Sequence, residues 1–137
     1  MRDIYHNIAI VQPLNTVVAT TTKTSTTIDI QSFESLMVLF SLGIAGDTLS
    51  GSIYWTLKLQ HSDDDSTYAD VPAASLLNGA NSIVIDSLTK DETAVLFGYS
   101  GGKRYVKAVA TPTGTHANGT PMSVIALKGT ANRKPVI

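Results

Sequence analysis

The chain contains no cysteine and few charged residues. Only 15% of its 137 residues are charged, against about 25% in typical soluble domains. Without cysteine there is no disulfide and no thiolate zinc site. The net charge of −1 excludes the basic field by which proteins attract nucleic acid, so we expect no nucleic-acid partner. Threonine and serine replace the missing charge, a composition that favours β-strands.

Long apolar runs are also missing. The longest, Leu36 to Gly43, is interrupted by Ser41 and falls well short of the roughly 20 residues that a membrane-spanning helix needs. The opening residues Met1 to Asp3 lead into a mixed segment without the apolar core of a signal peptide. We therefore expect a soluble protein that is made in the cytoplasm and has no membrane partner.

Alternating polarity, rather than helical spacing, runs through the sequence. The clearest segment is Ile53 to Gln60. Because successive strand residues point to opposite faces, one face of this segment is apolar and the other polar. The two faces carry, respectively, Ile53, Trp55, Leu57 and Leu59, and Tyr54, Thr56, Lys58 and Gln60. The first face should enter a core, and the second should meet solvent or a partner.

Further short strand candidates follow, with glycine- and aspartate-rich turns between them. They are Ser25–Ile30, Leu36–Leu42, Tyr68–Val71, Ser82–Ile85, Ala94–Tyr99, Arg104–Ala110 and Met122–Lys128. Leu36–Leu42 is apolar on both sides, as is typical of a strand central to a sandwich. A short helix is expected at Ala73 to Leu77. Strands with a turn every 8–12 residues or so predict an all-β, single-domain antiparallel β-sandwich, of jelly-roll or immunoglobulin-like type.

The predicted core contains Trp55, Leu57, Leu59, Val106 and Ile125. We expect the sandwich to occupy residues 13–130, between an extended N-terminal arm (1–12) and a C-terminal tail (131–137).

The two arms contain apolar residues with no evident place in that core. They are Ile4, Tyr5, Ile8, Ile10, Val136 and Ile137. Exposed apolar arms are normally ordered when a neighbour covers them, so these residues are candidate contacts with another subunit. The polar face of the clearest strand, with Tyr54, Thr56 and Lys58, is the next candidate.

No residue pattern indicates catalysis or metal binding. His6, His61 and His116 lie in separate segments, and we expect His61 and His116 to be exposed loop residues. Asp63–Asp65 lacks the glycine and glutamate of a calcium-binding EF-hand loop and is expected to be a turn. Neither a nucleophile elbow nor a phosphate-binding loop is present. We expect no enzymatic activity, no cofactor, and no catalytic or metal-binding residue.

Three stretches in order carry a family resemblance. They are Leu57–Val71 with its Gln-His-Ser-Asp-Asp turn, Gly98–Lys107 with Gly-Gly-Lys-Arg-Tyr-Val, and Thr111–Thr115 leading to the Ala126–Gly129 strand end. Together they resemble a family of small structural proteins encoded in the head gene clusters of tailed bacteriophages and prophages. The resemblance covers roughly residues 53 to 130.

The resemblance implies a non-enzymatic virion protein, assembled in the host cytoplasm. It would be a capsid decoration or cement protein, or a minor head protein, that binds the shell and its own copies. Its expected partners are the major capsid protein or other virion proteins, and it should be a homo-oligomer, with a trimer favoured. Two alternatives stay open: a head–tail adaptor or tail ring component, and a receptor- or carbohydrate-binding module on a fibre.

Overall fold

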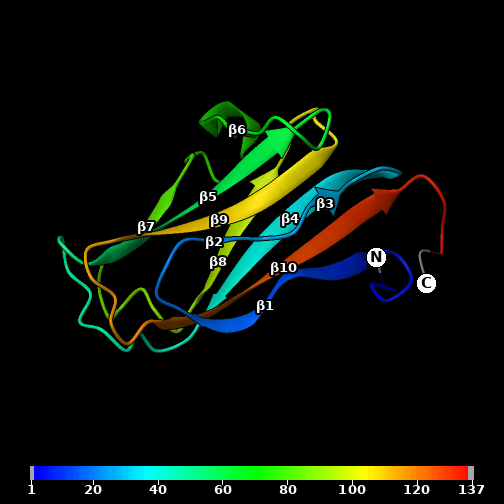
Figure 1. Ribbon diagram of the computed structural model, residues 1–137. Coiled ribbons are helices and arrows are strands. Elements are labelled where there is room, and N and C mark those ends of the chain that lie inside the picture. Colours follow the sequence, from blue (N-terminus) through cyan, green and yellow to red (C-terminus); the bar gives the residue numbers. More distant parts are fainter. Residues whose placement is uncertain (1, 136–137) are drawn as a thin grey trace.

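Two antiparallel sheets pack face to face in the computed structural model, which describes residues 2–135 (Figure 1). Sheet A has the order β1 (Ala9–Ala19), β10 (Thr120–Ala131), β4 (Phe33–Leu42) and β8 (Ala94–Tyr99). Sheet B is centred on β9 (Tyr105–Thr113) and β5 (Tyr54–Ser62). Its edges are β2 (Lys23–Thr24) and β3 (Ile28–Asp29) on β9, and β6 (Ala69–Asp70) and β7 (Ile83–Ile85) on β5. The predicted all-β sandwich is confirmed.

The predicted short helix is a single 3₁₀ turn, η1 (Ala73–Ser75). Proline fixes the backbone angle φ near −65°, and Pro72 precedes the turn with a φ of −68°. The turn stops at Leu76, whose backbone is extended and forms an isolated bridge with Tyr99. The segment after η1 therefore continues along the outer edge of β8.

The core lies between the inner faces of the two sheets. On β5 the inner residues are Trp55, Leu57 and Leu59, all fully buried, and Val106 of β9 joins them. These four core predictions are confirmed.

The prediction for Ile125 is wrong, because the inner positions of β10 belong to its neighbours Val124 and Ala126. Side chains alternate along a strand, so Ile125 points away from the core and is only half-buried.

Trp55 joins the two sheets by a hydrogen bond as well as by packing. Its indole Nε1 donates to the hydroxyl of Thr120 on β10 at 3.1 Å, and both side chains are completely buried. The ring of His116 packs against the indole, with 4.8 Å between ring centroids. Buried indole N–H groups need such a partner, so this bond fixes the position of β10 relative to β5.

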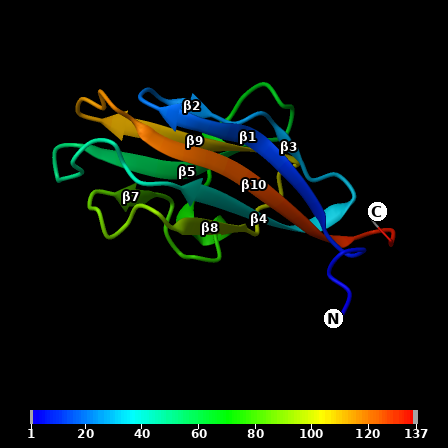
Figure 2. The same cartoon turned by 90° about the horizontal axis from the view of Figure 1, so that it is seen from below.

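The predicted N-terminal arm is shorter than its expected span of residues 1–12. Strand β1 begins at Ala9, and Ala9, Ile10 and Val11 pair with Lys128, Leu127 and Ala126 of β10. Backbone pairing with β10 therefore takes residues 9–12 into sheet A (Figure 2). At the other end, β10 includes residue 131, the first residue of the predicted tail.

Leu57 is buried in the core, whereas Ile125 lies on the outer face of sheet A. This difference gives a direct test of the register of β10. Leu57→Ala should lower the free energy of unfolding by about 2–5 kcal/mol, because it leaves a cavity in the core. Ile125→Ala, on the outer face, should cost about 1 kcal/mol or less in the free chain. Urea unfolding of both variants measures the difference, and equal losses would mean that the register of β10 is wrong.

Candidate interaction surface

Apolar side chains cover the middle of the outer face of sheet A. Leu39 of β4 pairs with Ile125 of β10 on one side and with Leu96 of β8 on the other. Directly paired residues share one face of a sheet, and the inner face is occupied by their neighbours Val38 and Phe97. The row Leu96–Leu39–Ile125 therefore faces outward, with Leu96 46% exposed.

A second apolar row crosses the same face. Ile10 pairs with Leu127, Leu127 with Met37, and Met37 with Gly98. Leu77 lies over Gly98, since a Cβ added to this glycine would be 3.0 Å from the Leu77 Cβ. Leu77 is 79% exposed, so it stands out at the β8 end of the row. We call these two rows the apolar face: Ile10, Met37, Leu39, Leu77, Leu96, Ile125 and Leu127.

The rows that flank the apolar face are uncharged too. On one side Ser41 pairs with Ser123 and Ala94, and on the other Gly129 pairs with Ser35. All outward positions in these rows, as far as the described residues extend, are thus free of charge. Removing a charge from water is costly unless it is paired. A face without charges can be buried against another protein at little electrostatic cost.

The outer face of sheet B has the opposite character. Tyr54, Thr56 and Lys58 lie together on the outer side of β5, half-buried, as the sequence predicts. The Lys58 ammonium and the Gln60 amide both donate to the carboxylate of Asp70, at 3.1 and 3.0 Å. The bonds from Gln60 and Lys58 lower the pKa of Asp70. The polar groups of β5 and β6 thus bond to one another, and the exposed apolar residue beside them is Val84, which pairs with Thr56.

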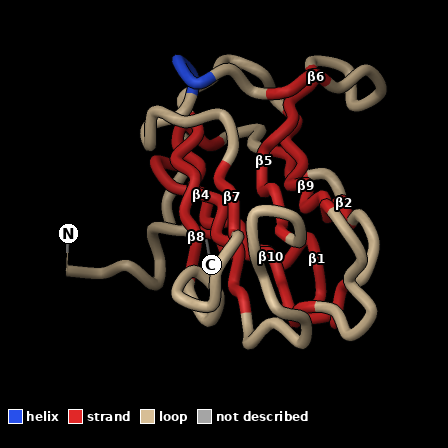
Figure 3. Tube along the Cα trace, turned by 90° about the vertical axis from the view of Figure 1, so that its left-hand side faces the viewer, coloured by secondary structure: helices blue, strands red, loops and turns tan. Residues whose placement is uncertain are grey.

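The N-terminal segment adds apolar surface beside the apolar face. Ile4 and Tyr5 are exposed, and Ile8 lies near Gly129, with 4.0 Å between its Cγ2 and a Cβ placed on the glycine. A hollow of about 460 Å³ is lined by Ile4, Tyr5, Ile8, Ala9 and Ile10. Figure 3 shows this segment extending away from the two sheets.

A small turn gives the N-terminal segment its shape. The backbone N–H of His6 donates to the Asp3 carboxylate at 3.0 Å, and the His6 ring nitrogen Nδ1 lies 2.6 Å from the other oxygen. These bonds lower the pKa of Asp3. The Tyr5 ring meets the His6 ring edge-on, at 5.0 Å between centroids.

The predicted contact residues thus fall into two separate groups. Ile4, Tyr5, Ile8 and Ile10 gather near the apolar face of sheet A, whereas the candidates on β5 lie on sheet B. Val136 and Ile137 lie outside the described residues.

Sequence reasoning missed most of the apolar face. The available signal was Leu36–Leu42, apolar on both sides, which we interpreted as typical of a strand central to a sandwich. In the structure β4 is central within its sheet, but among the described residues no third layer covers its outer side.

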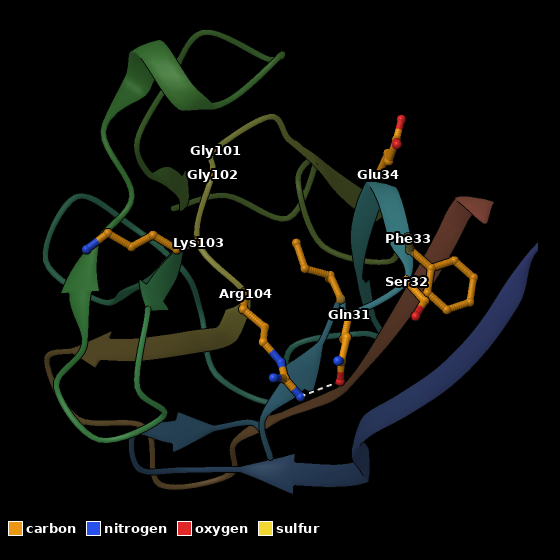
Figure 4. Close-up of a pocket in the computed structure, with 9 residues that line it drawn as sticks. Gln31, Ser32, Phe33, Glu34, Gly101, Gly102, Lys103 and Arg104 are labelled. Atoms are coloured by element: carbon orange, nitrogen blue, oxygen red, sulfur yellow. Dashed lines mark hydrogen bonds between the residues drawn. The ribbon is translucent and has the colours of Figure 1, made fainter. Parts of the chain in front are cut away.

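A second concave region lies between the start of β4 and the loop before β9 (Figure 4). Its most prominent polar group, the Arg104 guanidinium, is already occupied. It donates to both carboxylate oxygens of Asp29, at 2.9 and 2.8 Å, and to the Gln31 side-chain oxygen at 2.6 Å. Lys103 and Glu34 lie on opposite sides of the region and point away from it. The region therefore offers no group of converging charges for a ligand.

Two carboxylates of the three-aspartate turn, those of Asp64 and Asp65, accept hydrogen bonds from neighbouring groups of the chain. Asp64 accepts hydrogen bonds from the backbone N–H groups of Thr67 and Ser66 and from the Ser62 hydroxyl. These bonds lower the pKa of Asp64 to about 2. Asp65 accepts from the hydroxyl groups of Thr27 and Tyr68. Within residues 2–135, no group of three or more histidine or carboxylate side chains is arranged to hold a metal ion.

Two histidines expected to be exposed are buried. His61 belongs to β5, and its Nδ1 lies 2.9 Å from the Tyr99 hydroxyl. Burial lowers the pKa of His61. His116 lies in the loop before β10, where Nε2 contacts the carbonyl of Thr113 at 3.0 Å. The expectation was wrong because β5 extends two residues beyond its predicted end and the loop folds over Trp55.

The Arg104–Asp29 pair predicts an acid-sensitive step in stability. Hydrogen bonds from Arg104 lower the pKa of Asp29 to about 2, from an ordinary 3.8. A carboxyl whose pKa is lower when folded adds stability above its ordinary pKa and loses it as the pH falls toward the folded value. Thermal unfolding should therefore show a fall in stability between about pH 4 and pH 2 that Asp29→Asn reduces. Arg104→Gln should reduce the same fall, and an unchanged pH profile in both variants would contradict the pairing.

No helix in the described part of the chain is long and apolar enough to cross a membrane. Comparison with models of protein families and with curated proteins finds no match to the chain. The function proposed below therefore rests on the geometry of its surfaces and on the sequence resemblance described above.

Proposed function

We propose that this chain is a non-enzymatic structural protein of a tailed-phage particle, either a capsid decoration or cement protein or a minor head protein. The observation that supports this proposal best is the apolar face on sheet A. A protein of this kind works by burying surface against neighbouring subunits, and here one outer face is uncharged while the other is polar.

The exposure of the apolar face has a physical cost. A large apolar side chain that is fully exposed forgoes about 1.5–3 kcal/mol that full burial would provide, and the half-buried residues of this face forgo part of that. Extended apolar patches on soluble proteins mark sites of association. The sandwich itself does not need this face, because its core is complete between the two sheets. The working form of the protein is therefore one in which another protein surface covers sheet A.

The phage assignment rests on the sequence resemblance. The stretches that carry it lie on strands and on the connections between them. Its first stretch is the second half of β5 with the turn to β6, and its second is the connection from β8 to β9. Its third runs from the end of β9 into β10. These segments build sheet B and link it to sheet A.

Particle composition tests the proposal. Phage particles from the cells that encode the chain would be purified on a density gradient and separated into heads and tails. We expect the chain in the head fraction at many copies per particle, detected by quantitative mass spectrometry and by gold-labelled antibody in electron micrographs. A Leu39→Lys variant places a charge in the centre of the apolar face. Its number of copies per particle should be at least about tenfold lower than that of the wild type.

Thr56→Lys is the matched control, because it places the same charge on the outer face of β5. It should be incorporated normally. A chain absent from particles, or present only on tail fibres, would contradict the proposal. Equal incorporation of the two lysine variants would mean that the apolar face is not the contact.

A further inference from the structure

The apolar face has a projection at one end of a row and a hollow at the other. The row Ile10–Leu127–Met37–Gly98 crosses all four strands of sheet A. Leu77 projects above Gly98 at the β8 end, and the hollow described above lies at the Ile10 end. From this geometry we infer that the partner of the apolar face is a second copy of this chain. The inference builds on the surface named in the proposed function and specifies what covers it.

A twofold axis brings the projection and the hollow together. The axis would run parallel to the strands, between Met37 and Leu127, in the plane where two sheets meet. Rotation about it exchanges the two ends of the row, so Leu77 of one copy lies over the hollow beside Ile10 of the other, and the reverse. Each contact thus occurs twice, as in the isologous interfaces of most dimers. The strands of the two copies run nearly parallel, the arrangement of aligned sheet packing.

The area is sufficient for such a pair. Four strands spaced about 4.8 Å apart span about 19 Å, and the six steps from Ser123 to Gly129 span about 20 Å. This gives roughly 400 Å² of flat surface per copy. The uneven side-chain surface adds area, as do Leu77 and the N-terminal segment. The surface buried on both copies together is then about 1,000 Å², near the lower limit of specific interfaces. We therefore expect a dimer that forms at micromolar concentrations.

The charge pattern agrees with a second copy as the partner. An uncharged face is complementary to another uncharged face, and the second copy provides one. The outer face of sheet B, where Lys58 and Asp70 form an ion pair at 3.1 Å, lies outside this contact in both copies. A single contact of this kind joins two chains, so by itself it builds a dimer rather than the trimer expected from the sequence.

Analytical ultracentrifugation of the purified chain tests the dimer. The wild-type chain should change from monomer to dimer between about 1 and 100 μM, as expected of a weak contact near the lower limit of interface area. Leu77→Asp should raise the dissociation constant about tenfold or more, because it places an unpaired carboxylate in an apolar hollow. Leu77 is exposed in the free chain, so this variant should keep its thermal unfolding temperature.

Leu88→Asp is the matched control. Leu88 is also an exposed leucine, 61% accessible, in the connection from β7 to β8, and it is not part of the apolar face. The control should dimerise like the wild type. A chain that stays monomeric at 100 μM would overturn the inference, and so would equal effects of the two aspartate variants.

Cross-linking provides a second, independent readout. The chain has no cysteine, so one introduced cysteine can be linked only to another copy. Met37→Cys, beside the inferred axis, should react with a short bis-maleimide to give a covalent dimer, whereas Thr56→Cys on sheet B should give little. Equal yields would overturn the inference.

These experiments use the purified chain alone and need no phage particle. If the dimer is absent while the chain is found in heads, the second-copy inference fails and the proposed function stands. If the dimer forms but the chain is absent from particles, the proposed function fails and the pairing of copies stands.

Discussion

The packing of the inner side of β5 against sheet A is the contact on which the rest of the structure depends. Trp55 belongs to this buried core, its ring packs against His116, and its indole N–H is bonded to Thr120 on the opposite sheet. Since side chains alternate along a strand, fixing Trp55, Leu57 and Leu59 inward also fixes which residues of β5 face outward. The Thr120 bond sets the register of β10 in the same way, so that Val124 faces the core.

That one constraint determines the different character of the two outer faces. On sheet B the outward positions of β5 are mostly polar, and Lys58 and Gln60 bond to Asp70, although the paired positions on β7 and β9 include Val84 and Val109. On sheet A the outward positions of β4 and β10 are apolar, and the flanking rows hold only small uncharged residues. The core is buried between the two sheets, whereas no other part of the described chain covers the apolar outer face of sheet A. The apolar outer face, through which we propose that the chain associates, follows from the same alternation that builds the fold.

Sequence reasoning was sufficient for the fold and insufficient for the surface. The alternation in Ile53–Gln60 predicted both the strand and its buried face correctly, because a half-buried strand shows its orientation in its own sequence. For β10 the residues Val124, Ile125, Ala126 and Leu127 are all apolar, so the sequence does not reveal which two face inward. The answer depends on pairing with β1 and β4, which are far away in the chain. The same long-range pairing moved residues 9–12 from an arm into sheet A.

Oxidation of methionine side chains measures most directly whether the apolar face is covered. Met37 lies on that face, half-exposed, while Met122 is buried in the core. Hydroxyl-radical footprinting with mass spectrometry would compare the chain at submicromolar concentration with the assembled form. The structure predicts that Met37 becomes strongly protected on assembly, whereas Met122 is protected in both states and Tyr54 on sheet B is equally reactive in both. Unchanged oxidation of Met37 in the assembled protein would contradict the central claim that the outer face of sheet A is the site of association.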